Sequence, residues 1–307
     1  MTSLIKEKFE FDKFERRKQA FFRLYGWRFM PFAQKDPLPD PRLLVPHQIE
    51  EIRKMINAIK EGDLVSLVVS DIGLGKTALC KFLADALPQE DHPKIATVFL
   101  AGPSIGTPEQ MLRLILMRLE LEPKEGDVAA QFERLYRWHE MYPDLLLVII
   151  VDEFPEVNEN ALSVVRALAD LHGVAWVLNG QKNLLFKLLE KYSPALLQRK
   201  RVVLELRPMN TKETEELLML RMAWARGDFN NLTLSPFTRQ AVEEIQRLSK
   251  GIPREALKIA GDAVYAAIER GSVEILPQFI RAPKRARRIH KRTKRRRGIL
   301  SFLGLRR

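Results

Sequence analysis

The chain has 307 residues, 46% of them hydrophobic, which is enough for one large α/β core with a small second domain and excludes a small disulfide-stapled scaffold. Its net charge of +12 resides in the C-terminus, because residues 281–307 hold 13 of the 51 basic residues and none of the 39 acidic ones. A single cysteine, Cys80, excludes an intramolecular disulfide and fits a reducing compartment.

The N-terminal segment, residues 1–36, is rich in aromatic and charged side chains and has no apolar signal core. A proline-studded linker follows at 37–41, and a helix is expected near 47–60. The longest apolar runs of the chain are too short to span a bilayer as a helix. We therefore expect a cytoplasmic protein without a transmembrane segment.

The first chemical motif follows a mostly apolar run at 64–69, which is expected to be a buried strand. The motif is Ser70-Asp71-Ile72-Gly73-Leu74-Gly75-Lys76-Thr77, with Ala78 continuing into the next helix. A glycine-containing turn before a helix can wrap a polyphosphate with backbone N–H groups, while the lysine reaches the β and γ oxygens and the threonine hydroxyl holds Mg²⁺. The pattern G-x-x-x-x-G-K-[ST] is broken only at Ser70, which can serve in place of glycine if its φ is negative.

The second chemical motif is the apolar run at 145–151, which ends at Asp152 and Glu153. In hydrolytic P-loop proteins the first acid at this point holds the magnesium ion and the second activates the attacking water. The alternative is an ordinary turn and a strand that ends in two solvated acids, and the occurrence of both motifs in order disfavours it. ATP is expected rather than GTP, because no N-K-x-D sequence for guanine recognition follows.

Strands and helices alternate through the rest of the region 37–208. A capping box is predicted at Thr107, with Pro108 at the first helical position and Gln110 closing the box. Further strands are predicted at 95–100, 174–178 and 202–206, and helices at 128–141 and 160–171. This alternation predicts a parallel five-stranded sheet between helices, an α/β fold.

From residue 209 the pattern becomes purely helical, and three helix starts are predicted up to residue 276. They are Asn210 with Glu213, Ser235-Pro236, and Gly251-Ile252-Pro253. We expect this region to be a small helical lid, followed by a basic tail at 277–307 whose composition predicts disorder.

An ordered set of motifs in this chain resembles the AAA+ ATPases. The resemblance is to the branch of the ExeA-type secretion ATPases and the TnsC/TniB-type transposition regulators, and more distantly to the archaeal origin-recognition initiators. It covers roughly residues 21–276. The matching segments are 25–32, 39–44 with His47, the turn Asn179-Gly180-Gln181, the block 196–201 that leads to Arg207-Pro208, and Gly251-Ile252-Pro253-Arg254.

The resemblance implies roles for residues outside the two motifs. It implies that Asn179, or as second choice Gln181, orients the hydrolytic water as sensor 1, the alternative being that Asn179 only caps its turn. It implies that Arg254 places a guanidinium over the γ-phosphate as sensor 2, the alternative being a solvated arginine. Arg199, with Arg201 close behind, is expected to be an arginine finger that acts on a neighbouring subunit, the alternative being a solvated basic loop.

The resemblance also implies a homo-oligomer, a ring or filament, that ATP assembles and hydrolysis releases. The basic run at 281–297 predicts salt-sensitive binding to DNA or RNA that does not depend on sequence, and DNA is the expected partner. Ile299, Phe302 and Leu303 have the spacing of a sliding-clamp-binding peptide, although Arg296 stands where a glutamine is usual and short apolar patches arise by chance.

Two hypotheses about the function of this chain follow from the sequence. One is a DNA-associated ATPase of replication, recombination or transposition. The other is a membrane-associated ATPase of secretion or pilus assembly, with the basic tail on anionic lipid.

Overall fold

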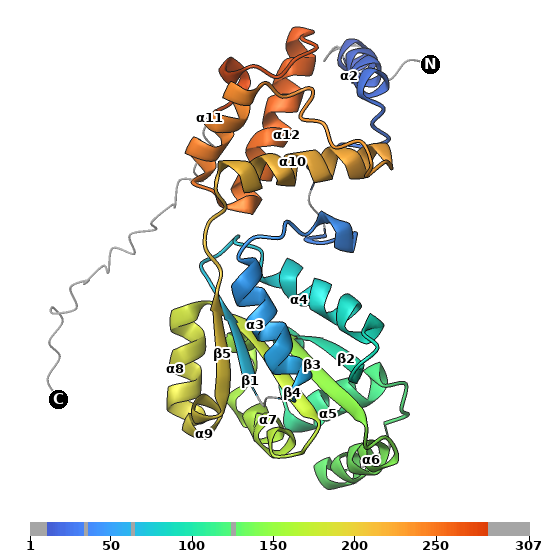
Figure 1. Cartoon of the computed structure of the whole chain (residues 1–307), viewed down its shortest axis with the longest axis vertical. Coiled ribbons are helices and arrows are strands. Elements are labelled where there is room, and N and C mark those ends of the chain that lie inside the picture. Colours follow the sequence, from blue (N-terminus) through green and yellow to red (C-terminus); the bar gives the residue numbers. More distant parts are fainter. Residues whose placement is uncertain (1–10, 34–35, 63–64, 124–126, 282–307) are drawn as a thin grey trace, which may run out of the picture.

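The computed structural model describes residues 11–33, 36–62, 65–123 and 127–281. Figure 1 shows two units stacked along the long axis, an α/β unit below and a helical unit above, joined where the chain leaves β5 for α10. The tail residues after 281, and with them Ile299, Phe302 and Leu303, lie outside the described part of the chain.

The α/β unit is built on one sheet of five parallel strands in the order β2-β3-β4-β1-β5. The strands are β1 (Val65–Val69), β2 (Lys94–Ala101), β3 (Leu145–Asp152), β4 (Val174–Gly180) and β5 (Lys200–Glu205). The predicted parallel five-stranded sheet is thus confirmed. Because β4 lies between β3 and β1, the ends of these three strands meet at one point of the sheet edge.

Helices cover both faces of the sheet, as the alternation of side chains along the central strand shows. On β3, Leu147 and Ile149 pack with one helical layer, and Val148 and Ile150 pack with the other. The first layer contains α5 (Pro108–Arg118), α6 (Val128–Met141), α7 (Leu162–Ala169), α8 (Lys182–Tyr192) and α9 (Pro194–Gln198). The second contains α3 (Ile49–Lys60) and α4 (Lys76–Ala86). Both faces are therefore buried, which explains why the strands read as continuous apolar runs.

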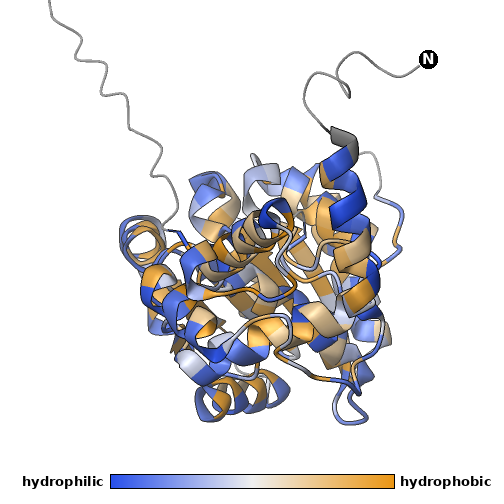
Figure 2. Ribbon diagram, turned by 90° about the horizontal axis from the view of Figure 1, so that it is seen from above, coloured by the Kyte–Doolittle hydropathy of each residue, from blue (hydrophilic) through white to orange (hydrophobic). Residues whose placement is uncertain are grey.

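The helical unit combines the C-terminal helices with the N-terminal segment. Its helices are α10 (Thr211–Arg226), α11 (Arg239–Ser249), α12 (Pro253–Arg270) and α2 (Phe11–Tyr25). Phe21, Trp27 and Phe32 belong to one buried cluster with residues of α10, α11 and α12, and α2 lies against α12. The view from above in Figure 2 shows the apolar colours gathered between the elements and polar colours on their outer sides. The sequence analysis assigned no helix to this N-terminal segment.

Two predicted caps can be compared with the structure. The capping box of Asn210 and Glu213 is present in both directions and begins α10 as predicted. At α5, Thr107 Oγ1 accepts from Gln110 N at 3.1 Å, but Gln110 Oε1 accepts from Gly106 N instead of Thr107 N. The predicted box at Thr107 is therefore only half formed, because the glutamine side chain reaches one residue further upstream.

The predicted helix start at Ser235-Pro236 is wrong. Helix α11 begins at Arg239, and Thr238 is its N-cap, with Thr238 Oγ1 accepting from Ala241 N at 3.3 Å. Pro236 is used elsewhere, because its carbonyl oxygen accepts from Ile275 N at 2.8 Å. The turn at 235–236 and the bridge residue Phe237 thus lie beside Ile275, and the helix starts only after this contact.

Candidate functional site

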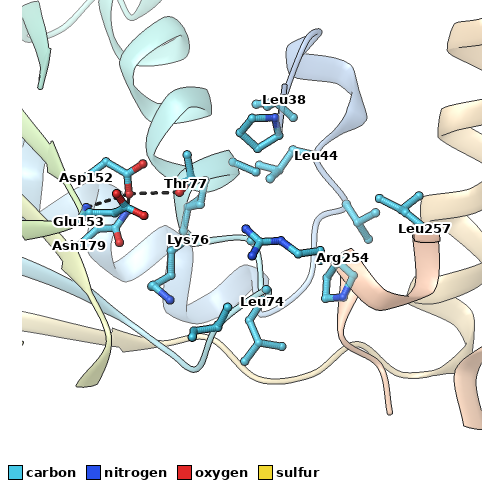
Figure 3. Close-up of a pocket in the computed structure, with 18 of the residues that line it drawn as sticks. Leu38, Leu44, Leu74, Lys76, Thr77, Asp152, Glu153, Asn179, Arg254 and Leu257 are labelled. Atoms are coloured by element: carbon cyan, nitrogen blue, oxygen red, sulfur yellow. Dashed lines mark hydrogen bonds between the residues drawn. The ribbon is translucent and has the colours of Figure 1, made fainter. Parts of the chain in front are cut away.

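A cavity of about 1100 Å³ lies between the α/β unit and the helical unit. Its walls are the loop at 70–75, the start of α4, the ends of β3 and β4, and faces of α10 and α12. A further wall is the segment 36–47, which contains a short 3-10 helix at Pro41–Leu43 and which we call the strap. Figure 3 shows the cavity with Lys76, Thr77 and the Asp152 group on one side and Leu38, Leu44 and Leu257 on the other. The two sides differ in chemistry, polar on the first and apolar on the second.

The loop before α4 has the backbone that a phosphate cradle requires. Gly73 and Gly75 have φ of 88° and 94°, a left-handed conformation that favours glycine. Ser70 is not among the residues with positive φ, so a side chain is tolerated where the motif usually has its first glycine. The loop is followed at once by the N-terminus of α4, whose free N–H groups favour an anion.

Lys76 lies over this loop. Its Nζ donates to Ser70 O at 3.1 Å, to Ser70 Oγ at 3.0 Å and to Asp71 O at 3.0 Å. Burial lowers the pKa of Lys76, and the nearby carboxylates of Asp152 and Asp71 oppose that shift. All three acceptors are neutral, and hydrogen bonds to a charged phosphate are stronger. A polyphosphate in the loop would therefore draw the ammonium group away from its present partners.

Asp152 gathers three donors at the end of β3. Its Oδ1 accepts from Thr77 Oγ1 at 3.1 Å, from Glu153 N at 3.0 Å and from Asn179 Nδ2. Magnesium in nucleotide sites usually takes one or two protein oxygens and completes its shell with phosphate and water. The hydroxyl of Thr77 and the carboxylate of Asp152 lie close enough together to supply two such oxygens, so the residues fit the ion.

Asn179 is fully buried at the end of β4, between the strands that carry the two motifs. Its Nδ2 donates to Asp152 and, at 3.4 Å, to Cys80 Sγ, while its Oδ1 has no partner among the described residues. The side chain is thus directed at Asp152 rather than at the turn that it could have capped. Burial raises the pKa of Cys80 to about 12, so this thiol is a packing group.

Glu153 has an unusual backbone conformation for a non-glycine residue, with φ 53° and ψ 41°. The absence of a side chain at Gly102 allows the backbone of Glu153 to pack closely against it, because a Cβ at Gly102 would lie 2.2 Å from Glu153 O. The Glu153 side chain is exposed, and no hydrogen bond or ion pair of the described residues engages it. Figure 3 shows it beside Asp152 and Asn179. A carboxylate that has no partner among the described residues and lies next to Asp152 is suited to accept a proton from water.

Arg254 reaches the cavity from the first turn of α12. Its backbone N–H donates to Gly73 O at 3.4 Å, and its positive charge contributes to the lowered pKa of Lys76. A Cβ at Gly73 would meet Ile252 Cγ2 at 3.0 Å. The helical unit therefore touches the phosphate loop directly, and Figure 3 shows the Arg254 guanidinium near the middle of the cavity.

Arg199 does not line this cavity. It follows α9 and precedes β5, so it lies at the edge of the sheet opposite the phosphate loop. Its Nη2 pairs with Asp170 Oδ1 at 2.6 Å. Gln181, the second choice for the sensor 1 role, is exposed and lines the cavity. The structure thus brings most of the proposed site residues to one cavity of the same chain; Ser70 and Asp71 at the start of the loop, and the two finger candidates Arg199 and Arg201, are not part of its lining.

The sequence analysis missed the apolar wall of the cavity. This wall comes from the strap and from the helical unit, and it includes Leu38, Leu44, Leu217 and Leu257. The sequence contains one indication of this wall, namely the apolar residues among the prolines of this segment, which are Leu38, Leu43, Leu44 and Val45. Their burial could not be deduced, because it depends on helices that follow more than 160 residues later.

Comparison with known proteins agrees with the fold and the motifs. The family model of the AAA domain matches residues 51–188, which include the phosphate loop, Asp152, Glu153 and Asn179. The part of the chain that carries the parallel sheet and both motifs is thus similar to the AAA domain.

Individual relatives extend over more of the chain. General secretion pathway protein A of Aeromonas hydrophila is 26% identical over 83% of this chain and 46% of its own length, so this chain spans about half of that protein. The ORC2 protein of Aeropyrum pernix, solved with ADPNP and ADP, superimposes with a TM-score of 0.63 at 16% identity, over 81% of this chain and 69% of that one. A chain of Drosophila ORC bound to DNA superimposes with a TM-score of 0.58 at 17% identity, over 80% and 66%.

Proposed function

We propose that this protein is an AAA+ switch that binds and hydrolyses ATP with Mg²⁺ at interfaces between its own copies, and acts on DNA or a DNA-bound complex. The observation that carries the proposal is the group at the ends of β3 and β4. There, Asp152 accepts hydrogen bonds from Thr77 and Asn179, and the neighbouring Glu153 carboxylate has no partner among the described residues.

The residues divide the work of hydrolysis as follows. Lys76 and the N–H groups of the loop bind the phosphates, and Thr77 with Asp152 holds the ion, which would neutralise charge on the β and γ oxygens. Glu153 accepts the proton of the attacking water, and Asn179 fixes the position of Asp152 and of that water. Arg254 contacts the γ-phosphate and so links its presence to the angle of the helical unit.

The first experiment separates binding from hydrolysis. Lys76→Ala is expected to abolish ATP binding, because it removes the cation that reaches the phosphates. Glu153→Gln is expected to bind ATP and to turn it over at least a hundredfold more slowly than the wild type, about the size of a general-base contribution. Calorimetric binding and phosphate release measure the two effects. A Glu153→Gln variant with wild-type turnover would show that another group is the base.

The proposal that the protein acts on DNA is supported by charge and by a structural relative. The basic run at 281–297 carries the excess charge of the chain, and the relative Drosophila ORC was solved bound to DNA. Residues 1–280 are close to neutral. A body without excess positive charge has little long-range attraction for phosphates, so the tail is proposed to supply most of the DNA affinity. Ile299, Phe302 and Leu303 are proposed to contact a sliding clamp.

A second candidate function, a membrane-associated ATPase, is favoured by the similarity to the secretion protein. No helix among the described residues is long and apolar enough to cross a membrane. Under this candidate the basic tail lies on anionic lipid, with Phe302 in the interface.

Deletion of residues 282–307 distinguishes the DNA-associated from the membrane-associated function. The DNA proposal expects the log-log salt slope of DNA binding to fall by several units, about 0.9 for each phosphate that the tail neutralises in the full-length protein, while hydrolysis without DNA persists. Full DNA affinity with an unchanged slope contradicts it. The membrane candidate expects full-length protein to pellet with anionic vesicles at physiological salt, and Phe302→Ala to weaken that binding more than DNA binding.

A further inference from the structure

Arg221, in α10, is a buried charge that the proposed hydrolysis does not use. It is 3% exposed and belongs to the lining of the cavity. Its Nη2 donates to Pro37 O at 3.0 Å, but its Nε and Nη1 have no partner among the described residues. Buried donors are rarely left without acceptors, because their desolvation is then uncompensated. Two such atoms on one side chain indicate an acceptor that the described residues do not provide.

No carboxylate of the described residues neutralises this guanidinium by a direct contact. Asp36 is close enough to oppose the effect of burial, which lowers the pKa of Arg221 to about 10. Its Oδ1, however, already accepts from Lys81 Nζ at 2.7 Å and from Leu38 N at 3.0 Å. A pKa of about 10 still leaves Arg221 charged at neutral pH. The charged guanidinium can donate hydrogen bonds but cannot accept them.

The position of Arg221 in the cavity indicates which part of a nucleotide it would meet. Leu217 precedes it by one turn of α10, so both side chains lie on the same face of the helix, and both line the cavity. Leu38, Leu44 and Leu257 form the apolar side of that cavity, across from the phosphate loop (Figure 3). A nucleotide with its phosphates on the loop directs its base toward these apolar residues.

We propose that Arg221 is the residue that contacts the nucleobase, with Nε and Nη1 donating hydrogen bonds to ring nitrogens of a purine. This inference rests on the proposed function and specifies its substrate. A guanidinium only donates, so it recognises the acceptor nitrogens N1, N3 or N7 and not the exocyclic amino group. Among the described residues one hydrogen bond, to Pro37 O, ties Arg221 to the strap. A small displacement of the strap by the entering base therefore exposes both donors to it.

The test measures affinity for ADP and for its 1-deaza, 3-deaza and 7-deaza analogues by calorimetry, which needs no hydrolysis. Each analogue replaces one ring nitrogen by a C–H group. The full-length wild type is expected to bind at least one analogue about tenfold more weakly than ADP, the size of a missing hydrogen bond to a charged donor. Arg221→Met keeps the length of the side chain without its donors, and it is expected to bind ADP and that analogue equally.

Arg226→Met is the matched control. Arg226 lies on the same helix and donates to Asn231 O at 2.6 Å, but it is not part of the cavity lining. This variant is expected to keep the discrimination of the wild type. Equal binding of ADP and all three analogues by the wild type overturns the inference, whether or not Arg221→Met folds. Discrimination that survives in Arg221→Met also overturns it, because Arg221 then has only a structural role. A wild type that binds no ADP overturns the proposed function itself.

Discussion

At the scale of single residues, the site depends on a backbone contact that no motif contains. Glu153 is held with φ 53° at the end of β3, and the carbonyl group of the same residue presses against Gly102. Left-handed backbone is unfavourable for a residue with a Cβ, so surrounding contacts must maintain it. Sequence patterns identified Glu153 through the apolar run before it, but the need for glycine at 102 depends on the neighbouring strand β2 and could not be foreseen.

Replacement of Gly102 by alanine tests this contact. The new Cβ would lie 2.2 Å from Glu153 O and 2.8 Å from Glu153 C, so backbone must move. We expect Gly102→Ala to lower the free energy of unfolding by about 1–3 kcal/mol, as overpacking does, and to reduce turnover more than ATP affinity. Urea unfolding, calorimetry and phosphate release measure the three quantities.

Gly106→Ala serves as the control in the same connection. Its Cβ would meet only the flexible Gln110 Oε1, at 3.0 Å, so a side-chain rotation relieves the contact. If Gly102→Ala behaves like Gly106→Ala in both stability and turnover, the Gly102 contact does not position the base.

At the scale of elements, the sequence correctly predicted a helix start where side-chain and backbone groups within four residues form hydrogen bonds with each other. Asn210 and Glu213 form such a closed unit, and α10 begins there as predicted. The start of α11 failed because Pro236 is engaged by Ile275, about forty residues away in sequence. Helix α2 was missed for the same reason, since its apolar side is buried in a cluster with α12, which follows more than 200 residues later. Signals confined to one element are readable from sequence, and those shared between elements are not.

Glu213 also links the cap of α10 to the connection between the two units, and this predicts a pH dependence. Hydrogen bonds from Arg207, at 2.8 and 2.7 Å, lower the pKa of Glu213 below its ordinary value of 4.5. A carboxylate with a lowered pKa in the folded state stabilises the fold above its unfolded pKa and loses that effect as pH falls through the folded pKa. Glu213→Gln keeps an acceptor for the cap but removes the charge.

We therefore expect Glu213→Gln to be less stable than the wild type at pH 7, and this difference to shrink as pH falls below about 4.5. Free energies of unfolding from urea titrations at several pH values measure it. Glu215→Gln, on the same helix but outside the Arg207 pair, is expected to change stability less at pH 7. A difference for Glu213→Gln that is constant down to about pH 3 contradicts the assignment.

At the scale of the whole molecule, the α/β unit and the helical unit close one cavity, but one of the predicted catalytic residues faces away from it. The cavity holds Lys76, Asp152, Glu153, Asn179 and Arg254. Arg199 is at the opposite edge of the sheet, paired with Asp170. This separation is incompatible with a role for Arg199 in its own site. The predicted role as an arginine finger in the site of a neighbouring copy remains. For that role Arg199 must break its ion pair with Asp170 and contact a phosphate of the neighbour's nucleotide.

A shared site can be tested by mixing two inactive variants. Arg199→Ala is expected to bind ATP with nearly wild-type affinity and to turn it over slowly, because a finger from a neighbour stabilises transition-state charge. Lys76→Ala lacks an intact phosphate loop but still carries Arg199. In an equimolar mixture about a quarter of the interfaces pair a good Arg199 with a good Lys76, so turnover should recover to about a quarter of the wild-type rate. The double variant Lys76→Ala with Arg199→Ala, mixed with either single variant, should restore nothing.

Arg201→Ala, measured in the same mixtures, decides between the two candidate arginines, because only the variant of the true finger is rescued by Lys76→Ala protein. Absence of rescue at every mixing ratio, in protein that still self-associates, contradicts a site shared between copies. Hydrolysis would then have to be completed within one chain, and Arg254, the cavity arginine whose backbone contacts the phosphate loop, would be the remaining candidate to stabilise the transition state.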